Sequence, residues 1–500
     1  MNWKQQHIAV IALLLLTAIQ LEAQVFMAKV VDSISGEPIP FATVQWAENS
    51  GVITNDNGVF SIDQAKTKKD MDSIHISSLG FVTKVFAATQ LFQNQELVIG
   101  LTPNTLELST VFLTNRNLNA LQVIKRVKDS MHLNYRGELS QKRVFYRQSD
   151  ASDFEKVGVH YKKSTIPEID QKLIDSVTGV LPNSAIYYRE ALVDFYGNTE
   201  KHKVRVLKAA ELYDNSANAS IEGMLGRMES ILKKRVKPDS YLKVKSGLFG
   251  MKVQLDSIIK LDDDSESLKE ELENQAKGNF HNHVRYGFKK LHRNLFYQDK
   301  AKLDVIKKSG RYEFELDEPS VMQGESVYVI HFSPKGKKDF KGTLYVNAQD
   351  FGVMRMDFEN VRWLRDVSLL GLSYRETLFK GIVIFEKSKE GQYSPKYARL
   401  QDGRRFGVER GIKIKEKNKY VKGRRKQNEV ALDIDFTNDA VVTYEYFVLE
   451  NNAIGQTAYN SARQNKNVKA VYLPAYDPGF WEGHAVIAPN EALRTFAVAE

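Results

Sequence analysis

The sequence predicts an α+β protein that is mainly β, with a small antiparallel β-sandwich near the N-terminus and a larger antiparallel sheet with packed helices after it. Three observations predict this class. Short apolar runs separated by turn residues fill the N-terminal region, and alternating apolar and polar residues dominate from Lys302 onward. Only a few segments show the three- and four-residue apolar spacing of an amphipathic helix.

Residues 1–23 have the pattern of a secretory signal peptide. A short basic start precedes the apolar run 8–16, and Ala23 is a small residue at the expected cleavage point. The run is too short to cross a bilayer, which requires ~20 apolar residues. We therefore expect an exported protein of a Gram-negative envelope, cleaved after Ala23 and located in the periplasm or at the outer membrane.

Composition excludes several kinds of chemistry. The chain has no cysteine, which excludes disulfides, thiolate metal sites, cysteine nucleophiles and a lipid anchor on cysteine. The net charge of +9 is a small excess of 71 basic over 62 acidic residues. Such a surface suits anionic lipid or polysaccharide as well as nucleic acid, and export argues against nucleic acid as a partner.

Residues 24–103 are predicted to form the small sandwich. Strand-like runs at 25–31, 42–46 and 58–62 are separated by turn residues, at the spacing typical of sandwiches. Asn57-Gly58 predicts a tight turn, because glycine readily adopts the positive φ that such turns require.

This segment resembles the carboxypeptidase regulatory-like domain, a transthyretin-like sandwich widespread in exported Bacteroidetes proteins. The resemblance rests on Gly-Glu-Pro-Ile-Pro at 36–40, Thr-Asn-Asp-Asn-Gly-Val-Phe at 54–60 and Ser-Ser-Leu-Gly-Phe at 77–81. In metallocarboxypeptidases the module accompanies the catalytic domain and carries no zinc. The zinc-peptidase spacing His-Glu-x-x-His is absent from the sequence, so the resemblance does not imply a carboxypeptidase.

Residues 104–135 are predicted to be a linker followed by an amphipathic helix. Its apolar residues recur at helical spacing: Leu118, Leu121, Ile124, Val127 and Met131. We interpret this stripe as core packing.

Residues 136–500 are predicted to form one sheet-rich α+β domain of unknown function. Early strands are expected at 143–147 and 156–161, and a hairpin joined by Gly197-Asn198 at 186–196 and 202–209. Later alternating runs predict strands at 312–316, 326–332, 342–348, 352–358, 381–386, 396–400, 411–420 and 441–448.

Two helices are expected within this domain, at 221–234 and 265–276. Asp262, Asp263 and Asp264 precede the second. We interpret them as residues that favour a helix N-terminus rather than as a calcium loop, because the spaced ligands and central glycine of an EF-hand are absent.

The region 327–356 is similar to one that follows the regulatory-like domain in a large Bacteroidetes group, many members of which continue into an outer-membrane barrel. Its strand-turn-strand pattern also resembles the open half-barrel of lipoprotein carriers, which hold acyl chains in a concave sheet under helices. These resemblances imply a lipid or an outer-membrane protein as partner. The sequence shows neither a terminal aromatic strand at 497–500 nor a run of ten-residue strands with apolar-out alternation, so we expect a soluble periplasmic product.

Two charged or polar clusters have alternative interpretations. His281, His283 and His292 lie in a basic context, and we predict a solvated face rather than a metal site. Lysines at 413, 415, 417 and 419 fall on one face of a strand, followed by basic residues at 422 and 424–426. They predict either an edge strand protected by charge, which we favour, or a contact with lipid phosphates or anionic glycan.

The segment 476–482 combines turn residues with Phe480 and Trp481. We expect a C-terminal loop anchored by these two aromatic residues, with a partner-binding tail as the alternative.

No catalytic, cofactor-binding or metal-binding residue is predicted. Neither a Gly-x-Ser-x-Gly elbow nor a phosphate-binding loop occurs, and Gly324-Glu325-Ser326 lacks the closing glycine. We therefore predict a non-enzymatic exported protein with a binding or scaffolding role, whose partner is an apolar ligand or another protein. The alternatives are a hydrolase of envelope polymers, with a site assembled from distant residues, and an outer-membrane-associated component of nutrient uptake.

Overall fold

The computed structural model describes residues 25–47, 50–63, 72–91, 97–104, 118–215, 218–237, 240–247, 249–254, 279–418, 420–423, 425–482, 484 and 486–498. The predicted signal peptide, the predicted helix at 265–276 and the aspartates at 262–264 lie outside these residues. The chain forms two compact units. Unit 1 comprises Met1–Pro103 and Asp477–Asn490, and unit 2 comprises Asn104–Tyr476 and Glu491–Glu500.

Unit 1 consists of two small sheets, with strand orders β4-β1-β7 and β3-β2-β5-β6. Its elements are β1 (Val25–Asp32), β2 (Thr43–Ala47), β3 (Ser50–Ile53), β4 (Val59–Asp63), β5 (Ser73–Ser77), β6 (Lys84–Ala87), α3 (Ala88–Leu91), β7 (Leu97–Leu101) and the 3-10 turn η2 (Pro478–Trp481). Neighbouring strands are antiparallel except for β1 and β7, which pair in parallel.

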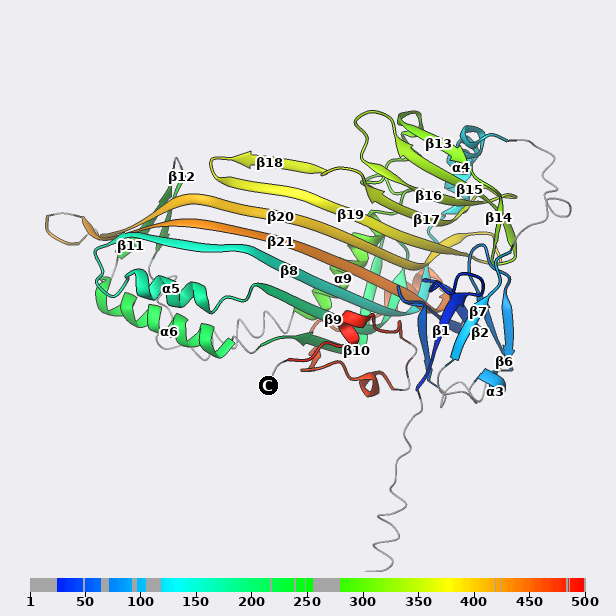
Figure 1. Ribbon diagram of the computed structural model, residues 1–500, viewed down its shortest axis with the longest axis horizontal. Helices are drawn as coiled ribbons and strands as arrows, with labels where there is room; N and C mark the ends of the chain where they lie inside the picture. The colour runs from blue at the N-terminus through cyan, green and yellow to red at the C-terminus, as the bar shows by residue number, and fades with distance from the viewer. Residues whose placement is uncertain are drawn as a thin grey trace, which may run out of the picture. The chain divides into compact units, whose positions relative to one another are not determined.

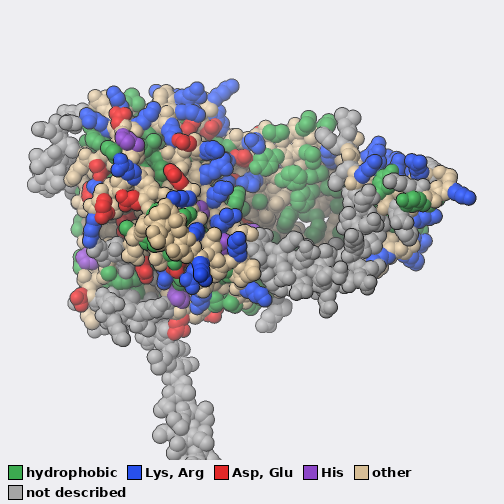
Figure 2. Space-filling model, turned by 180° about the vertical axis from the view of Figure 1, so that it is seen from behind, with side chains coloured by type: hydrophobic (Ala, Val, Ile, Leu, Met, Phe, Trp, Pro, Cys, Tyr) green, Lys and Arg blue, Asp and Glu red, His purple; other side chains and the backbone are tan. Residues whose placement is uncertain are grey.

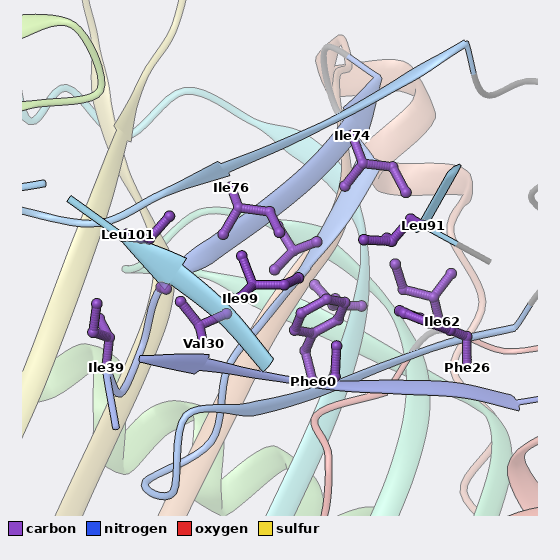
Figure 3. Packing of buried hydrophobic residues seen from close by; sticks show 14 of the residues in the cluster. Phe26, Val30, Ile39, Phe60, Ile62, Ile74, Ile76, Leu91, Ile99 and Leu101 are labelled. Atoms are coloured by element: carbon purple, nitrogen blue, oxygen red, sulfur yellow. The ribbon is translucent and has the colours of Figure 1, made fainter. Parts of the chain in front are cut away.

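The apolar faces of these two sheets enclose one core. Val30 on β1, Phe60 on β4 and Ile99 on β7 meet Ile74 and Ile76 on β5, and all five are buried (Figure 3). Alternation along each strand puts these residues on the inner face, so each sheet covers the other.

The predicted tight turn at Asn57-Gly58 is present and joins strands of different sheets. Gly58 has φ of 72°, and its N–H donates to the Asn55 carbonyl at 3.0 Å. Thr54 is fully buried, where its hydroxyl accepts from the Ala42 N–H at 2.8 Å and donates to the Ile39 carbonyl at 2.9 Å. The residues that carry the family resemblance therefore fix the chain where it passes between the sheets.

The segment around Phe480 and Trp481 belongs to unit 1. Trp481 is buried, and its ring packs edge-on against Phe480 at 4.9 Å between centroids. Further along, the Asn55 side-chain amide donates to the Pro489 carbonyl at 2.7 Å. The predicted anchoring of this loop thus holds for Trp481, while Phe480 is half-buried.

Unit 2 is built on one large sheet (Figure 1). Its strands are β8 (Ser140–Ser164), β9 (Ser184–Gly197), β10 (His202–Tyr213), β11 (Ser240–Ser246), β12 (Phe249–Gln254), β13 (Tyr312–Leu316), β14 (Ser320–Met322), β15 (Glu325–Pro334), β16 (Phe340–Asn347), β17 (Val353–Asn360), β18 (Arg365–Leu369), β19 (Leu372–Lys387), β20 (Tyr393–Asn418), β21 (Lys426–Ala453) and β22 (Val471–Tyr472). Its helices are α4 (Ala120–Asn134), α5 (Gln171–Gly179), α6 (Asn218–Arg235), α9 (Asn279–Arg293), α10 (Gln456–Ser461), α11 (Glu491–Arg494) and the 3-10 turn η1 (Ser309–Arg311).

The main path through this sheet is β13-β15-β16-β17-β19-β20-β21-β8-β9-β10-β22, and the path does not close into a barrel. Except for β22, which pairs in parallel with β10, the pairings are antiparallel. The predicted class, small N-terminal sheets followed by a larger open sheet with several helices, is confirmed.

Several strands are longer than predicted. The runs 143–147 and 156–161 belong to one strand, β8, and the runs 396–400 and 411–420 belong largely to another, β20. Glycines at 403, 407 and 411 separated the latter two in the sequence, yet all three lie within the paired strand. Because β20 has partners on both sides, its ladder hydrogen bonds hold these glycines extended despite their low strand propensity.

The predicted amphipathic helix is α4, but its buried face differs from the predicted one. Asn119 and Gln122 form a capping box, with both hydrogen bonds at 2.9 Å, which sets the helix start. The buried residues on one side of the helix include Val123, Ile124 and Val127. Leu121 is 56% exposed, so its place in the predicted stripe was wrong.

Candidate functional site

The middle of the large sheet carries an apolar row that crosses five strands. Residues directly opposite each other in an antiparallel ladder point to the same face. The register places five apolar residues opposite one another from β18 through β19, β20 and β21 to β8: Leu369, Leu372, Val408, Phe436 and Val157. We call these five residues the apolar row and the face they occupy the apolar face.

A second row of the same face lies beside it. It contains Val367, Tyr374, Phe406 and Phe154, with Asn438 as the polar member. The rings of Phe154 and Phe436 lie 6.0 Å apart, as expected for neighbours on one face.

These side chains are not sealed in a core. Leu369 is 61% exposed, Val367 54% and Phe406 43%, and Phe436 and Val157 are half-buried. Figure 2 shows hydrophobic side chains gathered in a hollow of unit 2, over the long strands. A contiguous exposed apolar surface of this kind is uncommon on a monomeric protein and marks a binding surface.

The opposite face of the same strands is charged and internally paired. Arg405 on β20 lies 2.7 Å from Asp439 on β21, and Arg375 on β19 lies 2.9 Å from Asp366 on β18. Lys156 on β8 reaches Asp435 on β21 at 3.3 Å. The two faces therefore differ: one is apolar, and the other carries a network of surface ion pairs.

Helix α9 covers one end of the apolar face. The Phe288 ring packs against Tyr446 of β21 and Phe195 of β9, with centroids 5.3 and 5.4 Å apart. Gly287 permits this contact, because a Cβ at that position would lie 1.9 Å from the Tyr146 hydroxyl oxygen. The helix thus lies directly on the sheet.

Helices α5 and α6 cover the other end of the same face. Leu173 of α5 and Ile231 of α6 form a small core with Val430 of β21, against which Ile414 and Leu432 pack. Ile414 lies opposite Val430 on the apolar face. The apolar row lies between this cluster and α9 along the long strands.

Charged side chains border the apolar row on the side of α9. Asp402 of β20 is buried and contacts the Lys290 ammonium of α9, and it accepts from Arg404 at 3.2 Å. Burial alone would raise the pKa of the Asp402 carboxyl, but hydrogen bonds and attraction from Lys290 and Arg404 hold it below its usual value. Lys302 also contacts Glu376 of β19 at 2.5 Å. The apolar row therefore ends at a border of fixed charges.

Two of the three histidines of the predicted solvated cluster are buried. His281 and His292 are buried in α9, with Nε2 atoms 3.1 Å from the Val204 carbonyl and 3.2 Å from the Tyr446 hydroxyl respectively. The predicted solvated face is wrong for both, because these residues lie on the sides of α9 that meet the sheet. His283 is half-buried. No group of three or more histidine, aspartate or glutamate residues in the described part of the chain is arranged to hold a metal ion.

The lysine row is also placed differently. Lys413, Lys415 and Lys417 lie on β20, which pairs with β21 on one side and with β11 on the other. The prediction of a charge-protected edge strand is therefore wrong. Lys419 and Arg424 lie outside the described residues.

A buried ion network contains two carboxylates, the residue type that the hydrolase alternative requires. Arg147 lies 2.7 Å from Glu190 and 3.6 Å from Glu445, which also accepts from the Tyr397 hydroxyl at 2.6 Å. Burial works against the Arg147 charge, yet the two carboxylates raise its pKa. Attraction between the guanidinium and the two carboxylates offsets the cost of removing these charges from water, which gives the network a structural role. It does not supply a site for the hydrolase alternative.

The sequence contains a pattern that indicates the apolar face, but this face was not predicted from it. Along 432–437, apolar residues alternate with aspartates and a threonine. Only the strand register reveals that five such alternating segments place their apolar residues in common rows. The Gly324-Glu325-Ser326 segment, which lacks the closing glycine of a nucleophile elbow, lies at the turn from β14 to β15, with φ of 79° at Gly324.

The family match found for this chain concerns its N-terminal region. Residues 28–113 match the family model of the CarboxypepD_reg-like domain, in agreement with the predicted resemblance. A search of curated proteins gave no match. Among the described helices, none is long and apolar enough to cross a membrane.

Several solved structures are similar over about two thirds of the chain. A LolA superfamily protein from Nitrosomonas europaea has 10% identity and a TM-score of 0.16, with 68% of this chain and 97% of that chain covered. A domain assigned to outer-membrane lipoprotein sorting from Vibrio parahaemolyticus has 8% identity and a TM-score of 0.20, with 68% and 97% covered. MucB in the Pseudomonas aeruginosa MucA/MucB complex has 8% identity and a TM-score of 0.15, with 67% and 99% covered. At such low scores these likenesses carry no argument about the ligand.

Proposed function

We propose that this chain is a non-catalytic binding protein whose large sheet holds an amphipathic ligand with a long aliphatic chain. The observation that carries the proposal is the apolar row, in which five strands contribute Leu369, Leu372, Val408, Phe436 and Val157 to one open line of side chains. An acyl chain is the simplest ligand that matches a row of apolar side chains without hydrogen-bonding groups.

The free energy that apolar burial on this surface supplies has an upper limit. Each methylene removed from water contributes about 0.8 kcal/mol. Burial of about ten methylenes would supply roughly 8 kcal/mol, which corresponds to a micromolar Kd before the cost of association is subtracted. The half-buried state of Phe436 and Val157 leaves apolar area that such a chain would cover.

The charged border of the apolar row suits the polar end of the same ligand. Lys290 and Arg404 share a single carboxylate, Asp402. With Lys302 and Glu376, the border holds three cations and two carboxylates, and this excess positive charge would attract a phosphate or carboxylate head group. The ligand is therefore proposed to be an anionic amphiphile, such as a lipid.

The location follows as a second part of the proposal. Residues 1–23 have the signal-peptide pattern, and a lipid-binding sheet has an evident use in an envelope where lipids must cross an aqueous space. We propose a periplasmic protein in which residues 24–103 form a regulatory-like module that displays the sheet domain. A protein partner on the same apolar face is the competing possibility.

The test compares two substitutions on adjacent residues of β21. Phe436→Asp places a carboxylate in the apolar row, whereas Thr437→Asp places one on the opposite face, across from Lys156. Titration with a fluorescent long-chain fatty acid should give wild-type affinity for Thr437→Asp and an affinity lower by on the order of tenfold or more for Phe436→Asp.

Equal affinities of the two variants would contradict binding on the apolar face. A complementary measurement is native mass spectrometry of the protein purified from its own envelope. A stoichiometric lipid supports the proposal. A lipid-free protein held by a defined protein partner would replace it with a scaffolding role.

A further inference from the structure

Lysines face each other across three strands at the end of the sheet that α5 and α6 cover. The register places Lys243 of β11 directly opposite Lys415 of β20 on one side and Lys252 of β12 on the other. Lys245 of β11 lies directly opposite Lys413 of β20. We call these five residues the lysine array.

This arrangement opposes folding. Like charges directly opposite each other on one sheet face are destabilising. Among the described residues, Lys415 is the member of the array with an ion pair, to Glu429 at 3.6 Å. That carboxylate is already held by Lys163 at 2.7 Å and by Lys426, and its hydrogen bonds to these two lysines lower its pKa to about 2. The array therefore keeps most of its positive charge.

The contrast with the rest of the same face is informative. Further along β20 and β21, cations and carboxylates alternate, as in the contact between Arg405 and Asp439. The strands thus accommodate compensating charges where they are present. A group of lysines placed opposite lysines indicates a surface whose charge serves an external anion.

The adjoining hairpin between β20 and β21 adds an aromatic residue to this charge. Tyr420 is 78% exposed and is fixed by its N–H, which donates to Asn418 Oδ1 at 2.8 Å. Lys417, Lys422 and Arg425 flank it in the chain. Figure 2 shows Lys and Arg side chains gathered at this end of unit 2. An exposed tyrosine among cations suits the head-group region of a bilayer, where its ring contacts apolar groups and its hydroxyl stays hydrated.

We propose that the lysine array and the Tyr420 hairpin together dock this end of the sheet on a bilayer that contains anionic phospholipid. Each lysine near such a surface strengthens attachment by its attraction to the lipid phosphates, and this attraction weakens with salt. Soluble polyanions would also attract the lysines, but they give no role to an exposed aromatic ring. The inference does not depend on which ligand occupies the apolar face, because the lysines lie on the other face of the sheet.

The experiment measures co-sedimentation of the full chain with vesicles of phosphatidylethanolamine and phosphatidylglycerol, and with vesicles of phosphatidylcholine alone. The double variant Lys243→Gln/Lys245→Gln should bind the anionic vesicles roughly thirty-fold more weakly, because two charges are removed. Its melting temperature should stay equal to that of the wild type or rise, because like-charge contacts are relieved. The full chain is used for every variant.

The matched control removes two lysines elsewhere on the same sheet. Lys341 and Lys380 both pair with Glu359, at 2.9 and 3.5 Å, and both are exposed. Lys341→Gln/Lys380→Gln changes the net charge equally and should leave vesicle binding within about twofold of wild type. Equal losses in the two double variants would overturn the proposal by showing that only net charge matters.

Tyr420→Ala separates a bilayer from a soluble polyanion. It should weaken binding to anionic vesicles several-fold and leave binding to heparin unchanged. Unchanged vesicle binding by Tyr420→Ala, or equal binding of the wild type to neutral and anionic vesicles, would overturn docking on a membrane. Fatty-acid binding should be unaffected in the Lys243→Gln/Lys245→Gln variant, so failure here is distinct from failure of the proposed function.

Discussion

The two units of this chain treat an apolar sheet face in opposite ways. In unit 1 the inner faces of two small sheets cover each other, and residues such as Phe60 and Ile76 have no exposed surface. In unit 2 helices cover the apolar face at its ends, and Leu369 and Phe406 between them remain exposed. The closed face contributes stability, whereas the open face retains apolar area that a ligand can cover. The contrast separates side chains that hold the fold from side chains available for function.

The largest expected effect comes from truncating one phenylalanine in each environment. Phe60→Ala should lower the stability of unit 1 by about 3–5 kcal/mol, because it leaves a cavity in a closed core. Phe436→Ala should cost unit 2 about 1 kcal/mol or less, because the ring is already partly in water. Hydrogen exchange followed by mass spectrometry measures the protection of each unit separately.

Similar losses in the two units would break the comparison. In that case Phe436 would act as an ordinary core residue, and the apolar face would be a structural surface. A ligand test on Phe436→Ala then discriminates further, since a functional residue loses affinity while keeping its unit folded.

The sequence predicts individual strands in both units, but not their full set or length. In unit 1, strands β1, β2 and β4 and the turn at Gly58 follow from local pattern, whereas β3, β5, β6 and β7 were not individually predicted. The long strands β8 and β20 were predicted as pieces, because glycines and polar residues interrupt their apolar alternation. Neighbouring strands on both sides keep these glycines and polar residues extended. Which strands become neighbours depends on residues far apart in the sequence, so the local pattern does not contain this information.

The candidate site was less predictable for the same reason. Alternation at 432–437 indicates one wet and one apolar face, but not which residues of other strands extend that face. The lysine row was identified from its spacing, whereas its like-charge neighbours on β11 became evident only from the register. Composition and spacing thus identify single residues of a surface, whereas the strand register shows which residues of different strands lie together on it.

A pH dependence sharpens the comparison at the end of the apolar face that α9 covers. His202 and His292 lie there with ring centroids 5.7 Å apart. Burial lowers the pKa of His202 to about 4, and burial together with repulsion from His202 and Lys142 lowers that of His292. Both rings are therefore neutral in the folded protein at pH values where they are protonated in the unfolded chain.

The sign of the effect follows from proton linkage. The stability that neutral His202 contributes is fully present above its unfolded pKa of about 6.5 and is lost as the pH falls towards 4. The loss from His202 alone should reach about 3 kcal/mol near pH 4. Lys142, with its pKa lowered by burial to about 8, is already protonated in both states over this range and adds no slope.

Urea unfolding between pH 7.5 and 4.5 provides the measurement. His202→Gln should reduce the fall in unfolding free energy with acidity, whereas His132→Gln, at an exposed position of α4, should leave it unchanged. An unaltered slope in His202→Gln would mean that His202 does not contribute to the acid sensitivity of unit 2.

The smallest expected effect tests how closely α9 lies on the sheet, and it uses two helical glycines. Alanine is intrinsically favoured over glycine in a helix by about 1 kcal/mol. At Gly226 of α6 an added Cβ has no neighbour within 4 Å, so Gly226→Ala should stabilise unit 2 by up to about that amount. At Gly287 of α9 the Cβ would meet the Tyr146 ring, so Gly287→Ala should destabilise by about 1–3 kcal/mol through displacement of the helix. Opposite signs in chemical denaturation would support a covered end of the apolar face that is packed at atomic contact. Stabilisation by both substitutions would mean that α9 rests loosely on the sheet, and the distinction between the covered and open parts of the apolar face would disappear.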